Sequence, residues 1–154
     1  MQSKAVPELT IRPMTEQDVD AVVEIEQMCQ PQPWTAEHFH NEVAEITFSS
    51  PLVAVQGGKT VGFLISWYMA DVVEITNVAV HPEFRRQGIG KKLLEAVFEQ
   101  AMLKSCSGVH LEVRAGNSGA IALYEGAGFV RTGTRQNYYA DNNEDAVLMS
   151  KILA

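Results

Sequence analysis

The sequence has few of the residues and runs that mark several large protein classes. It holds two cysteines, Cys29 and Cys106, without Cys-x-x-Cys spacing, so we expect reduced thiols and no disulfide framework. The four histidines show no metal-ligand spacing, so no metal is expected. No apolar run approaches the roughly 18 residues of a membrane span, and the first residues form no apolar signal core. These absences predict a cytoplasmic protein that binds neither a metal nor a membrane.

Basic side chains are also in short supply. The chain has 12 Lys and Arg against 19 Asp and Glu, which gives a net charge of −7 at pH 7. This balance disfavours nonspecific binding to nucleic acid and favours cationic substrates. A chain of 154 residues, of which 46% are hydrophobic, fits one globular domain, and we expect residues 1–154 to form it.

Apolar spacing predicts the order strand, two helices, three strands, helix, strand, helix, two strands. Thr15 and Thr35 are candidate N-caps for the first two helices, and Cys106 is expected in an exposed turn. The pattern indicates an α/β protein with a mixed sheet and helices on both of its faces. The predicted strands cover residues 9–12, 52–55, 61–69, 73–80, 109–114, 129–139 and 146–153. The long helix that follows the 85–92 segment runs to about Lys104, and a short helix covers 117–127.

The segment 85–92, with the sequence RRQGIGKK, carries the strongest functional signal. Gly88 and Gly90 lie between a predicted strand and a predicted helix and are flanked by cations. Glycine lets the backbone approach a ligand closely, and the first turn of a helix offers free N–H groups and a positive dipole end. The spacing fits neither a Walker loop nor a dinucleotide fingerprint. An ordinary helix cap is the alternative, but the basic flank favours a phosphate site.

The same segment matches the Arg/Gln-x-x-Gly-x-Gly signature of the GNAT family of N-acetyltransferases, and the whole element order resembles that family. The resemblance implies a GNAT fold, with a mostly antiparallel central sheet, and acetyl-CoA as acetyl donor. It implies that one strand pairs with the pantetheine arm and that the loop holds the pyrophosphate. The residues so assigned are Val78, Ala79, Val80, Arg86, Gln87, Gly88, Ile89, Gly90, Lys91 and Asn117.

Two side chains are candidates for proton transfer. Glu112 alternates with apolar neighbours in its strand, so it points away from the core, into a polar cleft or simply into solvent. Tyr124 shares a helical face with Ala120 and Ile121, where it is either core or a proton donor. The residue pattern by itself leaves both alternatives open.

Segments 111–117, 120–129 and 137–149 are similar to one branch of the GNAT family, the RimI type. That branch acetylates the N-terminal alanine of a small-subunit ribosomal protein. The resemblance implies that Glu112 is the proton acceptor and Tyr124 the proton donor in direct transfer within a ternary complex. It also implies that Trp34, Tyr138 and Tyr139 help to form the peptide site, and Glu74 is a candidate for attracting a basic peptide tail.

Three functions remain open at this stage. The leading one is N-terminal acetylation of a ribosomal protein. The second is acetylation of lysine side chains or small amines, and the third is a non-catalytic acetyl-CoA-binding module. The expected partners are acetyl-CoA and an N-terminal peptide, without nucleic acid or membrane, and weak self-association is allowed.

Overall fold

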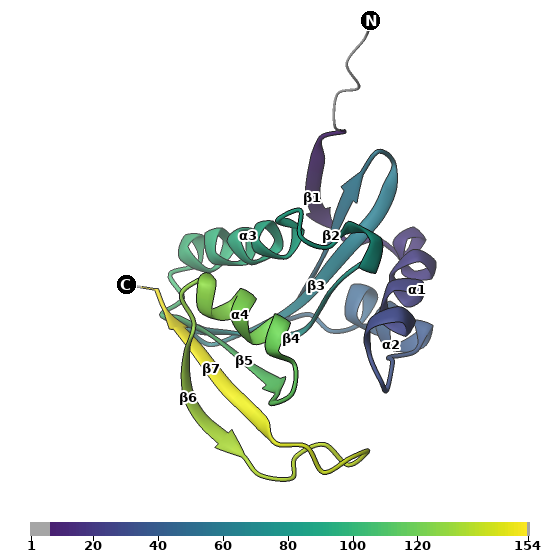
Figure 1. Ribbon diagram of the computed structural model, residues 1–154. Coiled ribbons are helices and arrows are strands. Elements are labelled where there is room, and N and C mark those ends of the chain that lie inside the picture. The colour runs from purple at the N-terminus through teal and green to yellow at the C-terminus, as the bar shows by residue number, and fades with distance from the viewer. Residues whose placement is uncertain (1–6, 154) are drawn as a thin grey trace, which may run out of the picture.

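The computed structural model describes residues 7–153, so residues 1–6 and 154 of the predicted domain lie outside it. The described residues form one sheet of seven strands, in the order β1-β2-β3-β4-β5-β7-β6 (Figure 1). Strands β4 and β5 are parallel and all other neighbours in this sheet are antiparallel, which confirms the predicted fold class. The strands are β1 (Leu9–Pro13), β2 (Ser49–Gln56), β3 (Lys59–Met69), β4 (Val72–Val80), β5 (Gly108–Arg114), β6 (Val130–Arg135) and β7 (Ala146–Ile152).

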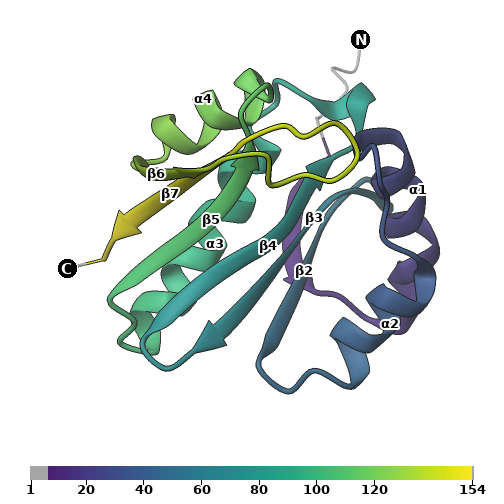
Figure 2. The same ribbon diagram turned by 90° about the horizontal axis from the view of Figure 1, so that it is seen from below.

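Helices cover both faces of the sheet, as Figures 1 and 2 show. Helices α1 (Val19–Cys29) and α2 (Ala36–Ala44) pack on one face around the fully buried Phe39 and Phe63. Helices α3 (Ile89–Leu103) and α4 (Ser118–Gly126) pack on the other face, where Leu93 and Leu94 of α3 are fully buried. None of the described helices is long and apolar enough to cross a membrane.

Two of the short helices start at side-chain caps. The Thr35 hydroxyl accepts the His38 backbone N–H at 3.2 Å, as predicted, and the Asn117 side chain accepts the Ala120 N–H at 3.1 Å. Thr15 instead precedes a short 3₁₀ turn, Glu16–Asp18, and α1 begins only after it.

The two parallel strands separate partway along their length. Val72–Ile75 of β4 pairs with Gly108–Leu111 of β5, and no β4–β5 pair lies beyond Ile75 in the described sheet. Figure 2 shows the strands close at one end and apart at the other. Ligand sites in α/β sheets commonly lie at the carboxyl ends of parallel strands, where such an opening exposes backbone and side chains.

Two details of the predicted fold were wrong. The sixth strand ends at Arg135 rather than at Tyr139, because Asn137 has a φ of 52°, a left-handed conformation that a strand cannot continue. Tyr138 therefore belongs to the β6–β7 loop, residues 136–145. Cys106 is only 6% exposed, since the turn that follows α3 folds back onto the core.

Candidate active site

Two cavities meet where β4 and β5 separate. The larger cavity, of about 790 Å³, lies over the end of β4 and the start of α3. The smaller cavity, of about 300 Å³, lies between the strands and the segment that joins α1 to α2. The residues that line both cavities are Gln30, Val78, Arg114, Asn117, Ala120 and Tyr124. A ligand in one cavity would therefore be in reach of a ligand in the other.

The larger cavity is cationic although the whole chain is acidic. Its lining includes the side chains of Arg85, Arg86 and Lys91 and the first turn of α3. The first N–H groups of a helix have no partner within it, and the earliest helical bond here runs from the Lys92 N–H to the Gly88 carbonyl at 3.0 Å. Three cations and a free helix N-terminus suit a phosphate group.

The two glycines of the loop are required for different reasons. Gly88 has a φ of 78° with open space where a Cβ would lie, so its backbone conformation selects glycine. Gly90 has ordinary helical geometry, but a Cβ there would lie 2.9 Å from Cδ2 of Leu123 on α4. Gly90 therefore permits close packing of α3 on α4 beneath the cavity.

Glu112 lies at the smaller cavity with a side chain that is 24% exposed. Its Oε1 lies 3.4 Å from Nε of Arg135 on β6. The neighbouring Glu112 carboxylate is also the first cause that raises the pKa of the Tyr138 hydroxyl. The acid thus points to the cleft rather than to bulk solvent, beneath a cation and a phenol from the C-terminal part of the chain.

Tyr124 is both a core residue and a cavity residue. It is 6% exposed, packs against Phe129 with ring centroids 5.8 Å apart, and lines both cavities. Burial raises the pKa of its phenol above the ordinary value of 10.0, and the nearby Tyr139 adds to this. The hydroxyl is therefore protonated at neutral pH and can donate a hydrogen bond where the cavities meet.

The smaller cavity has an aromatic side chain on each flank. Trp34 stacks on His38 with ring centroids 3.8 Å apart. On the opposite flank, the Arg114 guanidinium lies 4.0 Å from the ring centroid of Tyr139. Arg114 also forms ion pairs with Asp141 at 3.0 Å and with Glu144 at 3.4 Å. These ion pairs tie the β6–β7 loop to the end of β5.

Most of the sequence-predicted site residues line one of these two cavities. Gln87, Glu74 and Tyr138 do not. The Glu74 carboxylate is among the causes of the raised pKa of Tyr138, so these two residues lie near each other on the rim beside Glu112.

The polar lining residues that the sequence interpretation missed include Glu26, Gln30 and Asn77. Glu26 lies one turn after the buried Val22, and an acid on the apolar stripe of a helix is a signal that could have been noticed. Asn77 is likewise a polar residue inside an apolar strand.

The chain is similar to a known protein family, to named proteins and to solved structures. The chain matches the Acetyltransferase (GNAT) family over residues 19–129. It is 36% identical over 143 residues to the ribosomal protein bS18-alanine N-acetyltransferase of Escherichia coli K12, covering 92% of this chain and 95% of the relative. The crystal structure of the ribosomal-protein-S18-alanine N-acetyltransferase from Escherichia coli has a TM-score of 0.87 at 34% identity, covering 96% of this chain and 95% of that one. Ard1 from Thermoplasma volcanium has a TM-score of 0.87 at 31% identity, covering 95% and 98%.

Proposed function

Because this chain belongs to the acetyltransferase (GNAT) family, we propose that it moves the acetyl group of acetyl-CoA to the N-terminal amine of a ribosomal protein. The relative named for acetylating the alanine of bS18 matches nearly the full length of both chains, so that N-terminus is the substrate proposed here. One observation carries the proposal above all. A cationic cavity and a cavity with an acid meet at the hydroxyl-bearing Tyr124.

The larger cavity is the proposed donor site, and its residues fit coenzyme A. Arg86 and Lys91, with the free N–H groups at the start of α3, suit the pyrophosphate. Val78–Val80 pairs with β3 along one edge but has no β5 partner along the other in the described sheet. Backbone groups on this open edge can pair with an extended amide-containing arm in the manner of an added strand. Asn117, shared by both cavities, lies between the donor and the acceptor.

The smaller cavity is the proposed acceptor site, and Glu112 is its base. Most α-amines are protonated at neutral pH, since they titrate near 7.7–8.0, so one proton must leave before nitrogen attacks the thioester carbon. Glu112 accepts that proton directly or through one water. A C–N bond then forms, the C–S bond breaks, and nitrogen gives up a second proton, which offsets the proton that the departing sulfur gains. In this structure Arg135 lies against the Glu112 carboxylate, so its side chain has to move aside when the substrate ammonium binds there.

Tyr124 is the proposed partner of the departing sulfur. Its raised pKa makes full proton transfer to a free thiolate, which titrates near 8.5, unfavourable. Hydrogen bonding from the phenol stabilises the charge that develops on sulfur, and protonation is completed once the thiolate is itself desolvated in the cavity. Tyr124→Phe should therefore slow turnover by a finite factor, about 10-fold to 100-fold, that raising the pH does not restore.

Lysine side chains and small amines are the alternative acceptors. A lysine amine titrates near 10.4, so a modest carboxylate base prepares far less of it at neutral pH. The test compares a bS18 N-terminal peptide, the same peptide with a blocked α-amine and free lysines, and spermidine, by thiol release. We expect turnover of the free N-terminus only. Equal turnover of the blocked peptide would make the enzyme a lysine acetyltransferase, and no thiol release with any acceptor would leave only acetyl-CoA binding.

A further inference from the structure

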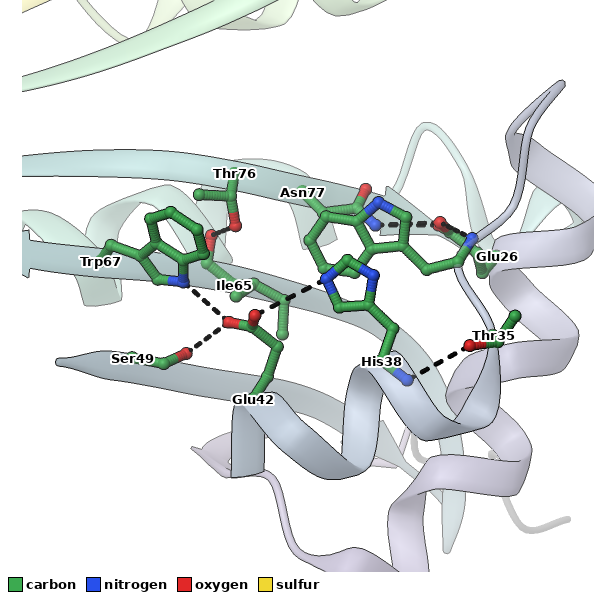
Figure 3. Close-up of polar contacts among 10 residues, drawn as sticks. Glu26, Thr35, His38, Glu42, Ser49, Ile65, Trp67, Thr76 and Asn77 are labelled. Carbon is green, nitrogen blue, oxygen red and sulfur yellow. Dashed lines mark hydrogen bonds and ion pairs between the residues drawn. The ribbon is translucent and has the colours of Figure 1, made fainter. Parts of the chain in front are cut away.

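A buried carboxylate lies behind the proposed acceptor site. Glu26 on α1 is 0% exposed, and both of its oxygens lie 3.0 Å from Nδ2 of Asn77 on β4. Its Oε2 also accepts the Trp34 backbone N–H at 2.9 Å. Figure 3 shows the labelled Glu26 and Asn77 facing each other between the helix and the sheet. Three parts of the chain are thus joined by one acid.

The same contacts fix the segment 30–34, which forms one side of the smaller cavity. Nε2 of Gln30 donates to Oδ1 of Asn77 at 3.2 Å, at the start of this segment. The Trp34 N–H donates to Glu26 at its end. Both ends are therefore tied to the Glu26–Asn77 pair, and the segment contains two prolines and no regular secondary structure of its own.

Burying the Glu26 carboxylate costs folding free energy, which points to a role beyond stability. Removing a carboxylate from water carries a large desolvation penalty, and well-packed apolar residues often replace buried ionic groups without loss of stability. Burial raises the pKa of Glu26, while the bonds from Trp34 and Asn77 oppose this. Asn77 lies past the last β4 residue that pairs with β5, where the strand edge opens to the cavity. A purely apolar filling there would leave the 30–34 segment without its anchors.

We propose that Glu26 and Asn77 form a polar brace that positions the 30–34 segment and thereby sets the affinity and first-residue selectivity for the acceptor peptide. The brace rests on the proposed function, because it assumes that the smaller cavity holds the peptide N-terminus. Both are positioning residues, and neither lines the larger cavity, so we expect acetyl-CoA binding to change little when they are replaced.

Exchange of the two functional groups gives a sharp test. Asn77→Asp places a second carboxylate against Glu26 and removes the hydrogen bond that the Asn77 amide donates to Glu26. Glu26→Gln combined with Asn77→Asp restores it, because the amide introduced at position 26 donates to the carboxylate introduced at position 77. That amide oxygen still accepts the Trp34 N–H, and Gln30 still finds an acceptor. Asn77→Leu removes the amide hydrogen-bond donor without adding charge, and it replaces Asn77→Asp in the test if the charged variant unfolds.

Each variant is assayed for peptide KM, kcat, acetyl-CoA Kd by calorimetry, and the ratio of kcat/KM for peptides beginning with alanine and with leucine. We expect Asn77→Asp and Asn77→Leu to raise peptide KM about tenfold or more, the size of one lost charge-assisted hydrogen bond. The alanine-to-leucine ratio should fall, and the acetyl-CoA Kd should stay within about twofold. The reciprocal double variant should return peptide KM to within about threefold of wild type.

The control is Glu42→Gln, which alters the fully buried acid of α2, outside both cavities, and should leave KM unchanged. A wild-type peptide KM in folded Asn77→Asp or Asn77→Leu would refute the proposal that the brace positions the segment. So would a double variant as poor as the single one, which would mean that the Glu26 charge itself acts on the substrate. Wild-type enzyme that never acetylates the α-amine peptide would instead count against the proposed function.

Discussion

Gly90 offers the most direct test of how the donor site is built. An added Cβ would lie 2.9 Å from Cδ2 of Leu123, about 0.6 Å closer than the ~3.5 Å of an ordinary carbon contact. Overpacking of this kind costs about 1–3 kcal/mol, and the better helix propensity of alanine offsets up to about 1 kcal/mol. Gly90→Ala should therefore lower the unfolding free energy by about 1 kcal/mol, or about 2–4 °C in Tm for a chain of this size.

The larger effect of Gly90→Ala should be on acetyl-CoA. Leu123 lines the larger cavity, so its displacement narrows the space beside the first turn of α3. We expect acetyl-CoA affinity to fall about tenfold by titration calorimetry. Adding Leu123→Ala removes the clashing atoms, and affinity should return to near wild type although this second truncation lowers Tm further. Stability and affinity would then move in opposite directions, which a general folding defect cannot produce.

A matched substitution separates these effects from helix propensity. Gly126 is the exposed last residue of α4, with nothing within 4 Å of an added Cβ, so Gly126→Ala should leave affinity unchanged and leave Tm unchanged or slightly raised by helix propensity. Wild-type acetyl-CoA affinity in Gly90→Ala would refute the placement of the donor beside this turn. Weak binding that persists in the double variant would mean that the new methyl group, rather than Leu123, obstructs the ligand.

Three more substitutions probe the base and the fold. Glu112→Gln keeps the shape and removes the basicity, so kcat at pH 7 should fall by about 10²-fold or more, and the loss should shrink above pH 8 in a pH–rate profile. Hydrogen bonding from Arg12 holds the pKa of Asp18 below its usual value; this stabilises the fold above about pH 4 and is lost as the pH falls through the lowered pKa. Arg12→Ala should thus cost about 1 kcal/mol at pH 7 in urea unfolding, after allowance for the exposed guanidinium, and progressively less as the pH falls through the lowered pKa of Asp18. Trp67→Phe removes a 2.7 Å bond to the buried Glu42 and should cost about 1–3 kcal/mol in urea unfolding, where wild-type stability would contradict this role.

Much of the fold was predictable because its signals are local. The apolar spacing of each helix and strand is visible within a few turns of sequence, and a cap such as Thr35 stands one residue before its helix. The errors came from contacts between distant segments. Nothing near Cys106 in sequence reveals its place in the core, and the left-handed Asn137 belongs to a loop held by Arg114, more than 20 residues earlier.

The site divides in the same way. The phosphate loop is contiguous, so its glycines and cations can be read together from eight adjacent letters. The acceptor side is assembled from separate segments, and Glu26 and Asn77 are 51 positions apart. Each residue alone is only a polar side chain in an apolar pattern. Their role follows from the contact between them, which the periodicity of the sequence does not predict.

This division has a consequence for how substrate choice can change. Beside the side chains of Arg86 and Lys91, the proposed donor contacts are backbone groups of β4 and the start of α3, which tolerate substitution as long as the elements keep their places. The acceptor cavity lies between two irregular segments, one tied to Glu26 and Asn77 and the other tied to Arg114. Because neither set of ties involves the β4 backbone that would face coenzyme A, changes in either segment that keep Gln30 and Arg114, which line both cavities, leave the donor contacts in place. Selectivity for the first residue of the peptide should therefore vary among relatives more than acetyl-CoA affinity does.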